Sequence, residues 1–245
     1  MPVKPELFQR TPLLNGEDIE AKRAELRAYF HTTLDRYEQL FETLRNNEAY
    51  YIKPISLRHP LIFYLGHTAT FFINKLVLAG VLTERIDPKL ESIFAVGVDE
   101  MSWDDLDEAN YEWPTVAEAM AYRRAMRQKV DELINSLPLT LPITWESPWW
   151  AIVMGVEHER IHLETSSVLI RQHALQYVQS HPDWQPCRAR GSAGSAPKNE
   201  LVAVFAGKVQ LGKDKTDPIY GWDNEYGHHE ADLPAFQASR YLVSN

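Results

Sequence analysis

Cysteine is nearly absent from this sequence: Cys187 is the only one among 245 residues. A single cysteine cannot form a disulfide within the chain. The opening residues, MPVKPELFQR, also lack the apolar stretch of a secretory signal. Both absences favour a reducing compartment, so we expect a cytoplasmic protein.

Long runs of positive charge are also missing. The chain has 25 lysine and arginine residues against 34 aspartate and glutamate residues, which gives a formal net charge of −9. Such a balance, without a basic stripe, disfavours nucleic acids and anionic membranes as partners. We therefore expect small-molecule partners, and no pattern in the sequence specifies an oligomeric state.

Uninterrupted apolar runs of membrane-spanning length are absent too. The most apolar stretch, LIFYLGHTATFFINKLVLAGVL, is interrupted by Gly66, His67, Asn74 and Lys75. The chain is 44% hydrophobic, enough to bury one substantial core. We interpret the stretch as a buried helix of a soluble domain.

Four segments have the length and the punctuation of helices. They cover about residues 17–46, 60–82, 114–138 and 147–173. The first has an apolar residue every three or four positions, and Pro60, Pro114 and Ser147 mark the starts of the others. Four long amphipathic helices predict an antiparallel bundle. The connection between the second and third helices contains GVDEMSWDDLDEANYEWP, and a loop of that length is usually functional or disordered.

The composition changes after the fourth helix. HPDWQPCRARGSAGSAPKNE is rich in proline, glycine, serine and alanine, which is typical of a linker. The alternating, β-branched stretch ELVAVFAGKVQLGKD then predicts strands. We therefore predict a helical domain over 1–180, a linker over 181–200 and the start of a second domain over 201–245. We expect that second domain to continue beyond Asn245, because the segment is too short to close a β-rich core.

The stretch VEHERIHLET contains an H-E-x-x-H sequence. Because an α-helix advances about 100° and 1.5 Å per residue, His158 and His162 point the same way one turn apart. Two imidazoles at this spacing can share one divalent metal, although two histidines on a helix can equally be core residues or a surface pair. Apolar neighbours favour the metal, since buried imidazoles need partners.

H-E-x-x-H is best known from zinc peptidases, whose third ligand is missing here. In one class glycine and histidine would follow at the positions of Thr165 and Val168. In another class a downstream glutamate completes the site, yet none stands between Glu164 and Glu200. Glu164 itself lies about 200° around the helix from the second histidine. A peptidase is therefore disfavoured.

The remaining candidate for a third ligand is His67, in FYLGHTATFF. A lone buried histidine is more often a core residue, but facing helices of a bundle can bring inward side chains to one metal. Gly66 would permit close approach of the backbones, and Asn74 shares the face of His67 and could bond near the site. His59 lies roughly 12 Å along the axis and is a poor candidate. The predicted ligands are His67, His158 and His162. Iron, zinc or nickel would fit such a site.

Other candidate site residues have simpler alternatives. Arg124 and Arg127 could bind a substrate carboxylate, although a solvated basic face is the favoured interpretation. Glu159 is expected to form a salt bridge or to support a ligand rather than to act as a general base. Four tryptophans could wall the site, although ordinary core packing is the commoner role. They are Trp103, Trp113, Trp149 and Trp150.

A family resemblance rests on two stretches of the predicted bundle and on the tail. SLRHPLIFYLGHTATFFINKL and SPWWAIVMGVEHERIHLETSSVLIRQ together resemble the DinB-type domain of the sulfoxide synthases that make thiol-histidines. The tail WDNEYGHHEADLPAFQASRYLVSN, with Gly207 and Gly212 before it, resembles the opening of a formylglycine-generating-enzyme-type domain. Residues on that family's recurrent positions are Asp223, Asn224, Glu225, His229, Phe236, Val243 and Asn245, and Gly227 replaces its usual proline. The resemblance implies a mainly α chain: a DinB-like four-helix bundle followed by the truncated start of an α+β domain.

The same resemblance implies a reaction. GVDEMSWDDL and HERIHLETSSVLIRQ look most like the ovothiol branch, the 5-histidylcysteine sulfoxide synthases. The resemblance implies a non-haem Fe(II) held by the three histidines, with O₂ as co-substrate, that joins cysteine to the imidazole of histidine as a sulfoxide. In the family a tyrosine of the second domain assists the chemistry. That tyrosine would lie beyond Asn245, as would the C-terminal methyltransferase that some members carry.

Three alternatives remain open. The first is an ergothioneine-pathway synthase that acts on hercynine; that branch tends to carry glutamine where Ile161 stands here. The second is a DinB-type metal-dependent thiol transferase, active from the bundle alone. The third is a structural or binding module whose histidines are core residues.

Overall fold

The computed structural model describes residues 10–96, 112–184 and 197–242. These residues fall into two compact units, one ending at Trp184 and one after it. The predicted stretch GVDEMSWDDL, with Trp103, lies outside the described residues, as do Cys187, Val243 and Asn245.

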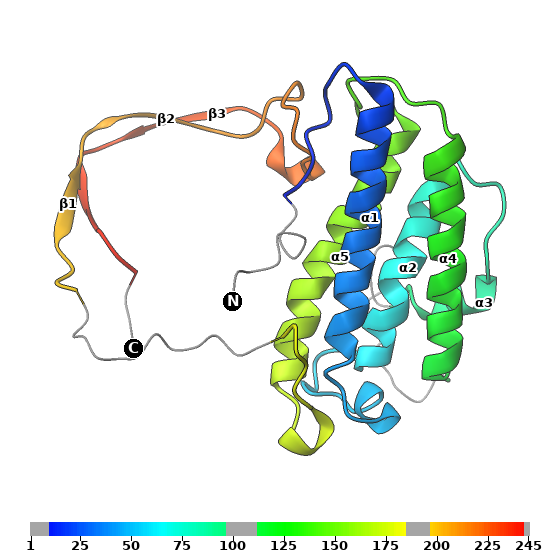
Figure 1. Cartoon of the computed structure of the whole chain (residues 1–245). Coiled ribbons are helices and arrows are strands. Elements are labelled where there is room, and N and C mark those ends of the chain that lie inside the picture. The colour runs from blue at the N-terminus through cyan, green and yellow to red at the C-terminus, as the bar shows by residue number, and fades with distance from the viewer. Residues whose placement is uncertain (1–9, 97–111, 185–196, 243–245) are drawn as a thin grey trace. The chain divides into compact units, whose positions relative to one another are not determined.

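Four long helices lying side by side build the first unit (Figure 1). They are α1 (Ile19–Phe41), α2 (Leu61–Leu78), α4 (Val116–Ser136) and α5 (Pro148–Arg171). The shorter elements are η2 (Asn47–Tyr50), α3 (Pro88–Ile93) and η5 (Leu175–Tyr177). α2 packs against α5 and α4, and α1 packs against α5. The four predicted helices are confirmed, whereas α3 lies in the connection for which no helix was predicted.

Three of the four long helices, α1, α4 and α5, begin where a side chain accepts a hydrogen bond from an amide of the first turn. Asp18 accepts a hydrogen bond from the Ala21 amide at the start of α1, and Ser147 accepts one from the Trp149 amide at the start of α5. Pro60 stands one residue before α2 rather than inside its first turn. Ser147 and Pro60 are local signals, which is why the sequence located the starts of α5 and α2 closely.

The start of α4 offers a direct test of a cap. Thr115 Oγ1 accepts from the Glu118 amide at 3.2 Å, and Glu118 Oε2 accepts from the Thr115 amide at 2.8 Å. We expect Thr115→Ala to lower the free energy of unfolding by about 1 kcal/mol, measured by urea denaturation. Ser167→Ala, which removes a partly exposed hydroxyl that donates to the Glu164 carbonyl inside α5, should change it by less than about 0.5 kcal/mol. Equal effects of the two changes would contradict the capping role.

The central helix of the unit is α2. Every residue from Leu61 to Ile73 is buried, because neighbouring helices cover all its sides. Among the described residues, one helix is long enough and apolar enough to cross a membrane, and that helix is α2. Most of it is buried inside the unit, as expected of the core helix of a soluble protein. The cytoplasmic location stays a prediction.

The second unit consists of two antiparallel strand pairs. β1 (Leu201–Val204) pairs with β4 (Phe236–Ser239), and β2 (Gly207–Leu211) pairs with β3 (His229–Leu233). A short 3₁₀ turn, η6 (Asp223–Glu225), precedes β3. Strands after residue 200 are thus confirmed. In the described part of this unit Tyr220 is the one large apolar side chain that is buried, so the ribbons enclose little core of their own. The formylglycine-generating-enzyme-type assignment and the domain boundaries stay predictions.

Candidate metal centre

Three histidines meet between α2 and α5. His67 comes from the middle of α2, and His158 and His162 come from successive turns of α5. One ring nitrogen of each lies within 4.8 Å of the others. The Nε2 atoms of His158 and His162 are 3.2 Å apart. Two nitrogens that are each bound about 2.1 Å from one metal ion lie about 3.0 to 3.4 Å apart, so this pair already has a suitable spacing.

A backbone carbonyl orients the imidazole of His67. Its Nδ1 lies 2.8 Å from the carbonyl oxygen of Phe94, just after α3. Because a carbonyl only accepts, Nδ1 carries the proton, and the Nε2 lone pair is left for another partner. Metal-binding histidines usually donate their second ring N–H in this way. The ring of Phe63 stacks on His67, with centroids 4.9 Å apart, and holds the imidazole plane.

Gly66 makes room for the Phe94 ring. A Cβ at Gly66 would lie 2.2 Å from Phe94 Cζ, far closer than two carbon atoms can approach. The expectation that Gly66 allows two helix backbones to approach is therefore wrong in its reason, since an aromatic side chain fills the space. The bare Gly66 backbone thus lets Phe94 pack where its carbonyl meets His67.

The imidazole of His158 packs against an aromatic ring and turns one nitrogen toward His162. Its ring stacks on Phe71, with centroids 3.6 Å apart and planes 8° from parallel. Its Nδ1 is buried and has no hydrogen-bond partner among the described residues. A buried ring nitrogen without a partner is costly. The ring nitrogen placed for a metal is Nε2, which faces His162, so the cost at Nδ1 is separate from coordination.

The histidines of α5 are held in their neutral forms. Burial, followed by the nearby charge of His67, lowers the pKa of His158 well below its ordinary value. The same two causes lower the pKa of His162 to about 3. Both imidazoles are therefore unprotonated at neutral pH, which is the form that binds metals.

Glu159, between the two α5 histidines, belongs to a different contact. Its Oε1 accepts from Arg123 Nη2 at 2.6 Å, and both side chains are fully buried. Burial raises the pKa of Glu159, and the Arg123 guanidinium opposes that shift. The predicted salt bridge is confirmed. A carboxylate held in this pair is poorly placed to act as the general base of a peptidase.

A comparison of the sequence with known protein families agrees with the four-helix architecture. Residues 29–166, more than half of the chain, match the DinB superfamily. The match contains all three histidines and most of the four-helix bundle. This chain belongs to the DinB superfamily.

A curated relative resembles the chain beyond the DinB bundle. Ergothioneine biosynthesis protein 1 from Neurospora crassa is 28% identical to the chain over 234 residues. The similarity covers 87% of this chain but 26% of the relative, so the chain spans about a quarter of the relative's length.

The predicted substrate-binding arginines lie outside the histidine cluster of the DinB bundle. Arg124 is exposed. Arg127 Nη1 lies 2.6 Å from Asp35 Oδ1, and its Nε donates to His31 Nδ1 at 3.0 Å. Arg127 is thus engaged with α1, and a role in binding substrate stays a prediction for both residues.

Other candidates from the sequence have different contacts. Asn74 was expected near the histidines, but its Oδ1 accepts from Arg85 at 2.5 Å. His59 packs against Phe63 and is not part of the cluster. The ring of Trp113 also lies against Phe63, 6.0 Å between centroids. In α5, Trp149 Nε1 donates to the Pro138 carbonyl, and Trp150 stacks on Trp145, so both belong to the packing around the start of that helix.

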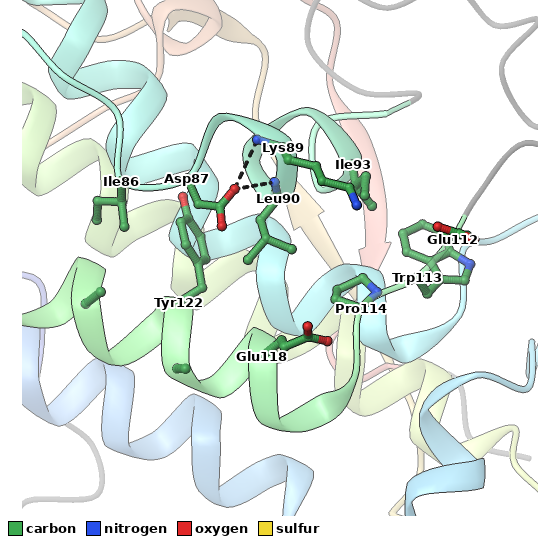
Figure 2. Close-up of a pocket in the computed structure, with 12 residues that line it drawn as sticks. Ile86, Asp87, Lys89, Leu90, Ile93, Glu112, Trp113, Pro114, Glu118 and Tyr122 are labelled. Carbon is green, nitrogen blue, oxygen red and sulfur yellow. Dashed lines mark hydrogen bonds between the residues drawn. The ribbon is translucent and has the colours of Figure 1, made fainter.

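A separate pocket of about 560 Å³ lies between α3 and the start of α4. Figure 2 shows Asp87 capping α3 through the amides of Lys89 and Leu90, with Tyr122 and Trp113 on other sides of the pocket. None of the three histidines lines it. The pocket is therefore distinct from the candidate metal centre.

Proposed function

We propose that this chain is the DinB-type, metal-binding part of a non-haem iron sulfoxide synthase. The observation that carries the proposal is the meeting of His67, His158 and His162 from two helices within 4.8 Å. The similarity to Ergothioneine biosynthesis protein 1, which covers most of the chain, supports this reaction class. The proposed enzyme joins a thiol to the imidazole ring of histidine or a histidine derivative.

The three histidines would hold Fe(II). Neutral nitrogen ligands leave the charge of the ion uncompensated and leave coordination positions open, which suits an anionic thiolate and an imidazole substrate. Bound Fe(II) would supply the oxidation chemistry with O₂. In the overall reaction a thiol S–H and an imidazole C–H are lost and a C–S bond forms. One oxygen atom of O₂ enters the sulfoxide and the other leaves as water.

Two branches of this chemistry compete for the substrate. Joining cysteine to histidine would belong to ovothiol synthesis and is favoured by the sequence around His162. A hercynine-dependent reaction of the ergothioneine pathway fits at least as well, because the curated relative carries that pathway in its name. Ile161, where the ergothioneine branch tends to carry glutamine, is an argument for the first branch.

A product assay separates the two branches. Purified full-length protein is loaded anaerobically with Fe(II), mixed with cysteine and either histidine or hercynine, and exposed to O₂. We expect a sulfoxide conjugate from one imidazole substrate, detected by mass spectrometry, with O₂ consumed in step with product. Zn(II)-loaded protein is the control and should consume no O₂. Failure to form either conjugate with iron bound would contradict the proposal.

A metal-dependent thiol transferase is the second candidate. The observation in its favour is that the helical unit alone brings all three histidines together. This reaction would proceed with Zn(II) and without O₂. Thiol transfer by the Zn(II)-loaded protein to an electrophilic acceptor such as bromobimane, in the absence of O₂, would favour it over the synthase.

A further inference from the structure

We infer that Arg123 and Glu159 form a positioning pair that sets the rotation of α5 against α2. By setting this rotation, the pair controls how closely His158 and His162 approach His67. The inference rests on the proposed metal centre but not on the reaction carried out there. It gives the middle glutamate of H-E-x-x-H a role other than proton transfer.

Arg123 contacts all three other long helices from its position on α4. Its Nη2 donates to Glu159 Oε1 of α5 at 2.6 Å, and its Nε donates to Glu38 Oε1 of α1 at 3.2 Å. Its Nη1 donates to two groups of α2, the Leu65 carbonyl at 3.0 Å and Thr68 Oγ1 at 2.7 Å. The planar guanidinium fixes the directions of these bonds, so the three helices are held at defined angles around it.

Two of the residues that Arg123 contacts directly follow a histidine of the cluster. Thr68 follows His67 directly, and Glu159 follows His158 directly. On α5, Glu159 lies about 100° around the helix axis from His158 and about 60° from His162. Rotation of α5 that moved Glu159 away from Arg123 would turn both imidazoles by the same angle.

Tyr37 of α1 contacts both α2 and α5 at a second position along these helices. Its hydroxyl donates to the Tyr64 carbonyl of α2 at 2.8 Å and lies 3.1 Å from Ser166 Oγ of α5. The Arg123 guanidinium lies over the Tyr37 ring, 5.1 Å from its centroid. The two sets of bonds together restrain both the rotation and the separation of α2 and α5.

Stability alone is a weak explanation for this pair. Both side chains are fully buried, and apolar residues of similar volume often serve as well as a buried ion pair or better. Apolar residues lack directional bonds, however, so they would leave the rotation of α5 less well defined. If the pair positions the ligands, its replacement by apolar residues should leave the protein folded but should change the geometry of the bound metal.

The test uses Co(II), whose visible spectrum reports the geometry of its ligands. The unaltered protein is titrated with Co(II), as is a double variant, Arg123→Met with Glu159→Leu, whose folding is checked by circular dichroism and thermal melting. We expect the double variant to fold but to bind Co(II) about 10- to 100-fold more weakly, with a changed visible spectrum. A control removes an ion pair between α1 and α4 that does not touch α5, through Arg27→Met with Asp131→Leu, and should leave both readouts unchanged.

If the double variant does not fold, Arg123→Lys is tested in its place. Lysine keeps the charge but cannot make the same set of directed bonds, so we expect weaker Co(II) binding with the fold retained. A folded double variant, or a folded lysine variant, with the affinity and spectrum of the unaltered protein would overturn the inference. Absence of Co(II) binding by the unaltered protein would overturn both this inference and the metal centre. Normal Co(II) binding with no sulfoxide product would overturn the proposed function alone.

Discussion

His67→Ala is expected to lower the affinity of the protein for Fe(II) by at least about 100-fold. The change removes one of three proposed ligands, and loss of a group that merely supports a ligand already costs about 10- to 100-fold. The remaining pair on α5 can still bind a metal, but only weakly, so little metal should stay bound through gel filtration. Anaerobic titration and the metal content of the recovered protein measure the effect.

His173→Ala is the matched control for this prediction. His173 is also a buried histidine, and its ring contacts Tyr177 rather than the cluster. We expect its replacement to leave metal affinity unchanged, whatever it does to stability. Metal content in His67→Ala equal to that of the unaltered protein would contradict the three-histidine centre.

Gly66→Ala should disturb both the fold and the metal centre. The new methyl group would overlap the ring of Phe94, which is fully buried, so the ring or the backbone beside it must shift. Overpacking of this kind costs about 1 to 3 kcal/mol, partly offset by about 0.5 to 1 kcal/mol because alanine favours helix. A backbone shift at Phe94 would also lengthen the contact between its carbonyl and His67. We therefore expect metal affinity to fall by about 10- to 100-fold.

A second substitution distinguishes the steric cause from general damage. Phe94→Leu makes space for the methyl group that Gly66→Ala introduces, while keeping the backbone carbonyl that His67 contacts. We expect Gly66→Ala with Phe94→Leu to recover metal affinity and to be more stable than the sum of the two single effects, measured by a double-mutant cycle. If the double variant binds metal no better than Gly66→Ala, the Phe94 ring is not the cause of the defect.

Much of the helical unit was predictable because its signals are local. The apolar spacing of the first helix, together with Pro60, Pro114 and Ser147 at the starts of the others, identified four helices and located their starts closely. The short helix α3 was missed even though Asp87 caps it, since six residues are too few to show an apolar period. The strand pairing of the second unit could not be predicted from the sequence either, because β1 pairs with β4, which is far from it along the chain.

The site was predictable where it depends on side-chain identity and spacing. His158 and His162 follow from helical geometry, and His67 followed from a search for a third donor in a facing helix. Arg123 was missed in favour of Arg124 and Arg127. Its signal was present, because Arg123 stands on the buried stripe of α4.

The remaining contacts that the sequence did not predict involve backbone atoms. The Phe94 carbonyl that orients His67 is a group that every residue carries, so no residue type marks it. The space above Gly66 likewise depends on where the chain returns after α3. Only the path of the backbone reveals either contact.

The separation of the ligands along the chain links metal binding to folding order. His158 and His162 are available to a metal as soon as α5 forms, but His67 joins them only after a loop of about ninety residues has closed. A metal bound by all three would act as a cross-link between the first and second halves of the bundle. Its full binding energy would be available only to the native state. Tight metal uptake would then mark the moment at which α2 and α5 have docked.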